Sequence, residues 1–214
     1  SLIALICIKN SGIFNADSFL NSIAQMYKVF VNEKTIYLTN TTKFSESQSI
    51  QLHKFSSKKE FIEVFNHFIN NENKSILILF GASIKKMFRK FVSCFTLIEA
   101  AGGLVKNTEE QYLFIFRHGK WDLPKGKSEQ FESIEHTAIR EVMEECGLPQ
   151  VSITAPLPET YHMYIDKDEW IVKCTYWFEM RTNSLDKLKP QYSEDITQAR
   201  SEERRVGKEC RSRW

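Results

Sequence analysis

The chain has 214 residues, of which 42% are apolar and 26% are charged. Such a composition can bury a sizeable core, and it excludes an intrinsically disordered chain. No apolar run reaches the roughly 18 residues of a membrane-spanning helix, and the apolar stretch Leu2–Ile8 lacks the basic flank and cleavage site of a signal peptide. We therefore expect no membrane partner. The five cysteines are scattered without a Cys-x-x-Cys pair, which indicates reduced thiols in the cytoplasm, with no disulfide framework and no zinc site.

The net charge of +2 depends on the last fifteen residues. Arg200–Trp214 carries six basic and three acidic residues, which leaves 23 basic and 24 acidic residues in the rest of the chain. We therefore expect no nucleic-acid partner. The segment lacks apolar periodicity and resembles the conceptual translation of a sequencing adapter, so we expect 200–214 to be a non-native tail; a solvated basic tail is the alternative. Residues 1–25 precede a more regular pattern and are either translated upstream sequence or a genuine extension.

Residues 26–95 predict a small α/β unit with the order ββαβα. Its two first runs are β-branched and aromatic and are joined by a tight turn, and a polar loop follows them. Its helices carry Phe-rich stripes at spacings of three and four, which we expect to be core, and the unit carries no recognisable chemistry. The expected elements are strands at Tyr27–Val31 and Thr35–Thr39, a loop at Asn40–Gln51, a helix through Phe61–Ile69, a strand at Ser75–Phe80 and a helix at Ala82–Val92.

From Leu97 the pattern changes to a mixed α/β (α+β) arrangement with one strong helix set between strands. A glycine pair in the first strand marks a place where another backbone can approach closely. The helix ends at Gly147, followed by Leu148 and Pro149, which is a well-formed stop signal. The expected elements are strands at Leu97–Val105 and Tyr112–Phe116, a helix at Ser133–Cys146, and strands at Thr160–Ile165 and Glu169–Met180.

Three carboxylates crowd the last turn of that helix. Glu141 is three and four residues before Glu144 and Glu145, and like charges at these spacings destabilise a helix by about 0.2–0.5 kcal/mol per pair. The helix dipole also disfavours anions there, and no Lys or Arg lies four residues further on. The cluster therefore needs a compensating cation, and hard oxygen ligands suit Mg²⁺ or Mn²⁺. The alternative is a solvated acidic helix face.

The complete pattern is Gly126, five residues, Glu132, seven residues, and then Arg140–Leu148 with the sequence REVMEECGL. It resembles the signature of the Nudix hydrolase superfamily, Gly-x5-Glu-x7-Arg-Glu-U-x-Glu-Glu-x-Gly-U, in which U is a bulky aliphatic residue. Every defined position matches, and we call residues 126–148 the box. The flanking AAGG and WDLPKGK sequences look like the same family, of the bacterial, MutT-like type, so the resemblance covers residues 97–199.

The resemblance implies an α/β/α sandwich with a mixed sheet and an enzyme that hydrolyses a nucleoside diphosphate linked to another moiety, with divalent cations. The WDLPKGK sequence is most similar to the branch that acts on dinucleoside polyphosphates, nucleoside triphosphates or diphosphoinositol phosphates. If the native sequence stops near Ala199, the last strand and the closing helix are absent, so we expect a truncated C-terminus and, in one alternative, an inactive fragment. The sequence does not indicate an oligomeric state.

The resemblance also assigns roles to the box residues. Glu141 and Glu145 are implied as the principal metal ligands, and Glu144 as a further ligand or a water-orienting base. Arg140 is expected to pair with Glu132, holding the loop against the helix. The remaining implied roles are a close approach of the loop to metal and phosphate at Gly126 and the helix stop at Gly147.

Substrate contacts are expected from residues that flank the box. Arg117, Lys125 and Lys127 are cations that suit phosphate oxygens, and Tyr164 lies on a strand from which it can stack on a base. Solvated lysines are the alternative. A second function class is a ligand-sensing Nudix-like regulator with residues 26–95 as its output module; the complete set of box glutamates favours the hydrolase.

Overall fold

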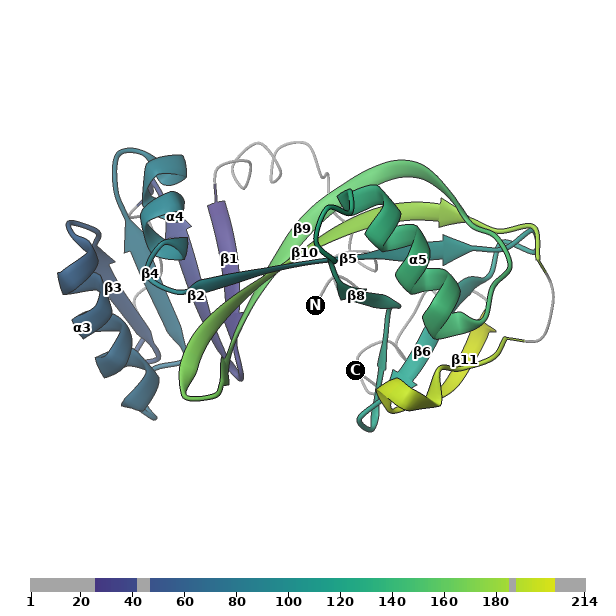
Figure 1. The fold of residues 1–214 in the computed structure, drawn as a ribbon. Helices are drawn as coiled ribbons and strands as arrows, with labels where there is room; N and C mark the ends of the chain where they lie inside the picture. The colour runs from purple at the N-terminus through teal and green to yellow at the C-terminus, as the bar shows by residue number, and fades with distance from the viewer. Residues whose placement is uncertain (1–25, 42–46, 185–187, 203–214) are drawn as a thin grey trace. The chain divides into compact units, whose positions relative to one another are not determined.

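A computed structural model of the chain describes residues 26–41, 47–184 and 188–202 (Figure 1). The expectations for residues 1–25 and for most of the tail at 200–214 lie outside the described residues. The described residues divide into two compact units. We call residues 26–98 with 161–174 the N-terminal unit, and residues 99–160 with 175–202 the box unit. No helix in the described ranges is long and apolar enough to cross a bilayer.

The N-terminal unit is a mixed sheet with two helices. Its strands follow the order β9-β1-β2-β4-β3. The β1–β2 pair is an antiparallel hairpin as predicted, whereas β4 pairs in parallel with both β2 and β3. The elements are β1 (Met26–Val31), β2 (Lys34–Thr39), β3 (Ile50–Lys54), α3 (Lys58–Asn70), β4 (Ile76–Phe80) and α4 (Ile84–Val92).

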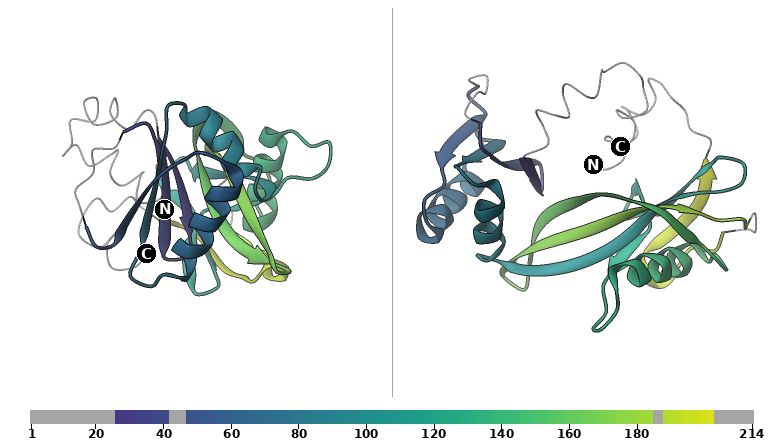
Figure 2. Two further views of the ribbon diagram at one scale, coloured as in Figure 1. Left: turned by 90° about the vertical axis from the view of Figure 1, so that its left-hand side faces the viewer. Right: turned by 90° about the horizontal axis from the view of Figure 1, so that it is seen from above.

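Both helices lie on one face of this sheet (Figure 2). Ser57 caps α3 by accepting a hydrogen bond from the backbone N–H of Glu60. The Phe-rich stripes face the strands, and Phe61, Phe65 and Phe91 are buried in one apolar cluster with strand side chains. The prediction that these phenylalanines form the core is therefore confirmed, and burial of each aromatic ring contributes roughly 1.5–3 kcal/mol.

The strand β3 was not predicted, so the expected ββαβα order is wrong by one strand. It spans Ile50–Lys54, so its first two residues lie in the expected loop Asn40–Gln51, and no element was predicted for the other three. Among the described strands it is at the edge of the sheet, with β4 as its one strand neighbour, and Leu52 is 46% exposed. An edge strand buries little, so its short alternation of apolar and polar residues is a weak signal.

Lys34 stabilises the N-terminal unit by capping the carboxyl end of α3. Its ammonium group donates hydrogen bonds to the carbonyl oxygens of Phe68, Asn71 and Lys74 at 3.0, 2.7 and 2.7 Å. Lys34→Met removes all three charge-assisted bonds and leaves those carbonyls without this donor, so we expect a loss of about 2–3 kcal/mol in unfolding free energy. Urea denaturation measures this loss, and Lys59→Met, at an exposed lysine on α3 itself, is the control. Equal losses in the two variants would contradict the capping role of Lys34.

The box unit is built on the strands β11-β6-β5-β10-β9. The short strands β7 and β8 pair with β6 and β5 respectively. As predicted, the glycine pair of β5 admits another backbone, because a Cβ at Gly102 would overlap the backbone at Pro124 and Lys125. The elements are β5 (Thr96–Lys106), β6 (Tyr112–Arg117), β7 (Lys120–Asp122), β8 (Lys125–Lys127), α5 (Ile134–Cys146), β9 (Ser152–Asp166), β10 (Glu169–Arg181), the 3-10 turn η1 (Tyr192–Glu194) and β11 (Ile196–Glu202).

The helix α5 packs on the sheet of the box unit through an apolar cluster that includes Ala138, Val142 and Cys146 (Figure 1). A mixed sheet with few helices agrees with the α+β class and the Nudix fold expected from the resemblance. Among the described residues of this unit, α5 is the only α-helix, so the second helical layer of the expected sandwich is not among them. The three cysteines that are described, Cys94, Cys146 and Cys174, are free thiols, as predicted.

Two expected boundaries differ from the structure. The strand β9 begins at Ser152, eight residues before the predicted start. Residues 161–174, which include the end of β9 and the beginning of β10, belong to the N-terminal unit, although we assigned all of 97–199 to the second domain. The strand β11 continues through Arg200–Glu202, pairing with β6, so the expected tail boundary at 200 falls inside a strand. Strand pairing, which local sequence does not record, sets both boundaries.

Candidate active site

The acidic end of α5 is fixed by both of its caps. Ser133 begins the helix and accepts a hydrogen bond from the backbone N–H of His136. Gly147 ends it in the left-handed conformation, with φ of 66°, and a Cβ there would crowd the backbone of Lys189 at 2.9 Å. Glycine is therefore required by both conformation and space. The box helix thus stops at the predicted residue, directly after its three glutamates.

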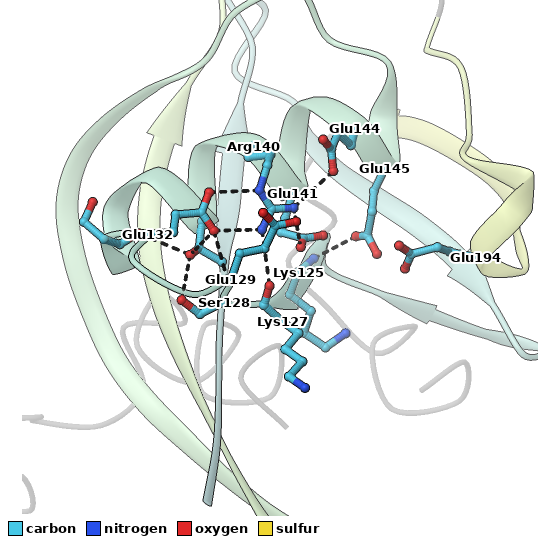
Figure 3. A network of polar contacts seen from close by, with 12 residues as sticks. Lys125, Lys127, Ser128, Glu129, Glu132, Arg140, Glu141, Glu144, Glu145 and Glu194 are labelled. Carbon is cyan, nitrogen blue, oxygen red and sulfur yellow. Dashed lines mark hydrogen bonds and ion pairs between the residues drawn. The ribbon is translucent and has the colours of Figure 1, made fainter.

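Arg140 is the centre of the polar network (Figure 3). Its Nε and Nη2 donate to the two carboxylate oxygens of Glu132, both at 2.9 Å, in a bidentate pair. Its Nη1 donates to Glu141 at 2.7 Å and to Glu144 at 3.2 Å, and Nη2 also reaches the carbonyl oxygen of Lys127 at 3.2 Å. Arg140 hydrogen bonds hold the pKa of Glu132 at about 2. The guanidinium thereby ties the loop to the helix.

Glu141 lies buried under the loop that precedes the helix. Its side chain is 7% exposed, and its Oε1 accepts from Arg140. Burial raises the pKa of the Glu141 carboxyl, and the Arg140 hydrogen bond opposes the rise. A Cβ at Gly126 would overlap this carboxylate, so only glycine lets the loop cover it. Gly126 therefore sets the position of Glu141.

Glu145 is the most deeply buried acid of the box, with no exposed side-chain surface. Its Oε2 accepts from the backbone N–H of Lys125 at 2.7 Å, whereas its Oε1 is buried without a hydrogen-bond partner. Arg117 also faces it, with its Nη1 at 3.5 Å from Oε1. Burial raises the pKa of the Glu145 carboxyl to about 7. A buried acceptor without a donor is costly, and it indicates a group that binds there.

The described carboxylates are paired with basic groups and do not converge on a point. Within residues 26–41, 47–184 and 188–202, no three His, Cys, Asp or Glu side chains form a group that could hold a metal ion. Arg140 takes an oxygen of Glu141 and one of Glu144, and Glu144 is about half exposed. The sequence argument that a dication must compensate the cluster is therefore incomplete, because Arg140, four residues before Glu144, supplies one positive charge.

Only some of the residues predicted to bind substrate lie beside the box carboxylates. Arg117 lies beside Glu145. Lys125 contributes its backbone N–H, because its ammonium group pairs with Asp122 at 2.6 Å. The side chain of Lys127 points away from the carboxylates (Figure 3). Tyr164 is in the part of β9 that belongs to the N-terminal unit, outside the box unit.

Glu194 is a site residue that sequence analysis missed. It ends the turn η1, and Figure 3 shows its carboxylate facing that of Glu145. Its Oε2 lies 3.6 Å from Nη1 of Arg117, and its charge contributes to the raised pKa of Glu141. No motif surrounds it in the sequence, and only the strand pairing of β11 with β6 brings it beside Arg117. The site therefore contains four carboxylates.

Gly126→Ala is expected to lower hydrolysis at least about tenfold with little loss of stability. The added Cβ displaces the carboxylate of Glu141, which is the flexible end of a side chain and moves without moving backbone. Gly81→Ala is the matched control, because its Cβ displaces only the side chain of Met87, in the N-terminal unit. Turnover and thermal unfolding are measured for both variants. Full activity in Gly126→Ala would show that the position of Glu141 is unimportant.

Comparison with known proteins identifies the family. A model of the NUDIX domain matches residues 96–204. The chain is similar to the solved structure of the MutT protein from Methanosarcina mazei Go1, at 20% identity over 50% of this chain and 76% of that chain, with a TM-score of 0.39. It is also similar to the Ap4A hydrolase of C. elegans in a binary complex, at 21% identity over 49% and 78%, with a TM-score of 0.38. Because the family match includes the whole box and over half of the chain, this chain belongs to the Nudix hydrolase superfamily, a group of pyrophosphohydrolases.

Proposed function

We propose that this chain hydrolyses a diphosphate linkage in a small nucleotide-type substrate and that it uses Mg²⁺, with Mn²⁺ as a substitute. One observation carries the proposal: the buried Glu145 carboxylate has an oxygen without a hydrogen-bond partner, at the end of a box whose every defined position is filled. A carboxylate in that state is a ligand for a hard cation. Its neighbours Glu141, Glu144 and Glu194 offer the same type of oxygen.

The carboxylate oxygens of the box have the chemistry that a hard divalent cation prefers, although the described side chains do not converge on one point. Glu145 and Glu141 would hold the ion from the last turns of α5, with Glu144 beside them as a further ligand or a base. A bound dication would neutralise charge on the diphosphate oxygens and lower the pKa of a water molecule. The residues themselves supply a rigid anionic surface, because both ends of the helix are capped.

The other box residues position these ligands. The backbone N–H of Lys125 fixes one oxygen of Glu145, and Arg140 keeps the loop against the helix through Glu132. Glu144 is about half exposed, so it is the box carboxylate that water can reach. We assign it the acceptance of the proton of the attacking water, a step typically worth about 10²–10⁴-fold in rate.

The proposed substrates are small anhydrides: dinucleoside polyphosphates, nucleoside triphosphates or diphosphoinositol phosphates. Arg117 is the cation of the site that is best placed for a phosphate oxygen, because it lies beside Glu145. Lys127 and Tyr164 remain proposals as substrate contacts. A cytoplasmic location is part of the same proposal, and the free thiols of the described cysteines support it.

A substrate screen tests the proposed function. The chain is incubated with each of the three substrate classes in Mg²⁺ and in excess EDTA, and products are separated by anion-exchange chromatography. We expect Mg²⁺-dependent cleavage of at least one class, lost in Glu145→Gln and kept in the exposed control Glu159→Gln. Binding of a nucleotide without turnover, unchanged by Glu145→Gln, would instead favour the ligand-sensing regulator.

A further inference from the structure

Arg117 bridges two carboxylates that come from different parts of the box unit. It ends β6, and its Nη1 lies 3.5 Å from Oε1 of Glu145 on α5 and 3.6 Å from Oε2 of Glu194 on η1. Both distances exceed those of a good charge-assisted hydrogen bond, which are about 2.7–2.9 Å. The guanidinium therefore neutralises the two acids without a close fit to either.

Two polar atoms in this group make no hydrogen bond. Among the described residues, Oε1 of Glu145 and Nε of Arg117 are both buried and make no hydrogen bond. The carboxylate oxygen can accept a hydrogen bond, whereas the guanidinium N–H can donate one. In a well-formed buried ion pair the remaining donors and acceptors are also hydrogen-bonded, and here these two atoms are not. The open acceptor suits a cation and the open donor suits an anion.

We propose that Arg117 is a counter-ion of Glu145 and Glu194, and that it competes with a dication for these two carboxylates. The inference rests on the proposed function, because it takes the box acids as the metal site. A dication and a guanidinium beside the same carboxylate oxygens repel each other, so each weakens the binding of the other. We therefore expect metal binding to release Arg117 from the two carboxylates. The N–H groups of Arg117 can then donate hydrogen bonds to the anionic substrate. The consequence is an order of binding, with the metal before the substrate.

The direction in which Mn²⁺ affinity changes when Arg117 is replaced distinguishes competition from a purely structural role. If Arg117 only held the acids in place, its removal would let them separate and would weaken metal binding. If it competes, Arg117→Gln strengthens the binding of Mn²⁺ alone, about tenfold for the loss of one nearby positive charge. The same variant then binds inorganic pyrophosphate at least about tenfold more weakly when Mn²⁺ is saturating, because a phosphate contact is lost.

The experiment titrates the full chain with Mn²⁺ and follows free Mn²⁺ by electron paramagnetic resonance, without any nucleotide. Arg117→Lys keeps the charge and is expected to bind Mn²⁺ like the wild type. Arg181→Gln is the matched control, because Arg181 is 53% exposed and pairs with Glu110 outside the box. Mn²⁺ affinity in Arg117→Gln that equals or falls below that of the wild type overturns the competition, and so does the absence of Mn²⁺ binding in all variants. A wild type that binds Mn²⁺ but cleaves no diphosphate contradicts the proposed function alone.

Discussion

Glu145→Gln is expected to leave the chain folded, to lower Mg²⁺-dependent hydrolysis at least about a hundredfold, and to flatten the pH dependence of stability without metal. The amide keeps the size of the side chain and an oxygen that can accept from the backbone N–H of Lys125. It removes the negative charge that a dication needs at the most buried position of the site. The loss in rate and the change in pH dependence therefore have the same cause.

The pH effect follows from the raised pKa of Glu145. Its carboxyl has a pKa of about 7 in the folded chain against 4.5 as the ordinary value, so between these values the folded state binds more protons than the unfolded state. Stability from this group is complete below about pH 4.5 and is lost as the pH rises to about 7. The loss is about 3 kcal/mol, on the order of 1.4 kcal/mol for each unit of pKa.

Glu132 affects the pH dependence of stability in the opposite direction and in a lower pH range. Its pKa of about 2 lies below the ordinary value, because Arg140 stabilises the charged form. Its contribution is complete above about pH 4.5 and is lost as the pH falls toward 2. Measurements between pH 5 and 8 therefore avoid the contribution of Glu132, and the comparison with Glu145→Gln identifies the contribution of Glu145.

Urea denaturation in EDTA at pH 5, 6, 7 and 8 measures the difference between the wild type and Glu145→Gln. We expect the wild type to lose stability relative to the variant as the pH rises, and the exposed control Glu159→Gln to follow the wild type. Parallel curves for wild type and Glu145→Gln would show that Glu145 is ionised in the metal-free chain over this whole range. Retained turnover in the variant would contradict its role as a ligand.

The box helix was predictable because several local signals agree on it. Ser133 at the start, Gly147 at the end and apolar residues on one side together specify its length and its buried face. The expected pairing of Arg140 with Glu132 is present, and it came from the family resemblance. The burial of Glu145 was not predictable, since it depends on the loop and strands that cover the helix end.

The charges that compensate the acids show the limit of reasoning along one helix. The sequence prediction considered only cations that follow the glutamates, so it did not include Arg140, which precedes them. The other contributions to Glu145, from Arg117 on β6 and the backbone N–H of Lys125 on β8, come from strands, and no helical spacing records them. Glu194 joins the site for the same reason, through the pairing of β11 with β6.

The fold shows the same division between local and long-range information. Elements with strong periodicity, such as α3 and the β1–β2 hairpin, were predicted within a few residues. The edge strand β3 was missed, because its pairing with β4 and not its composition makes it a strand. The added length of β9 includes Pro156 and Pro158, which lowered the strand signal there.

Arg140→Lys is expected to lower the free energy of unfolding by about 2–4 kcal/mol and to reduce hydrolysis strongly, although it keeps the positive charge. Lysine has no planar fork, so it cannot bond both oxygens of Glu132 and also reach Glu141, Glu144 and the carbonyl of Lys127. Glu141 is then buried with a weaker partner, and the loop that carries Gly126 loses its tie to the helix.

The matched control for this variant is Arg181→Lys. Arg181 is about half exposed and makes a single ion pair with Glu110, so its replacement should cost no more than about 0.5 kcal/mol. Urea denaturation of both variants, with and without Mg²⁺, measures the difference. If Arg140→Lys were as stable and as active as Arg181→Lys, the guanidinium network would contribute only charge. A loss confined to Arg140→Lys, and coupled to Glu132→Gln in a double-mutant cycle, would instead show that the planar fork organises the acidic end of α5 before any cation binds.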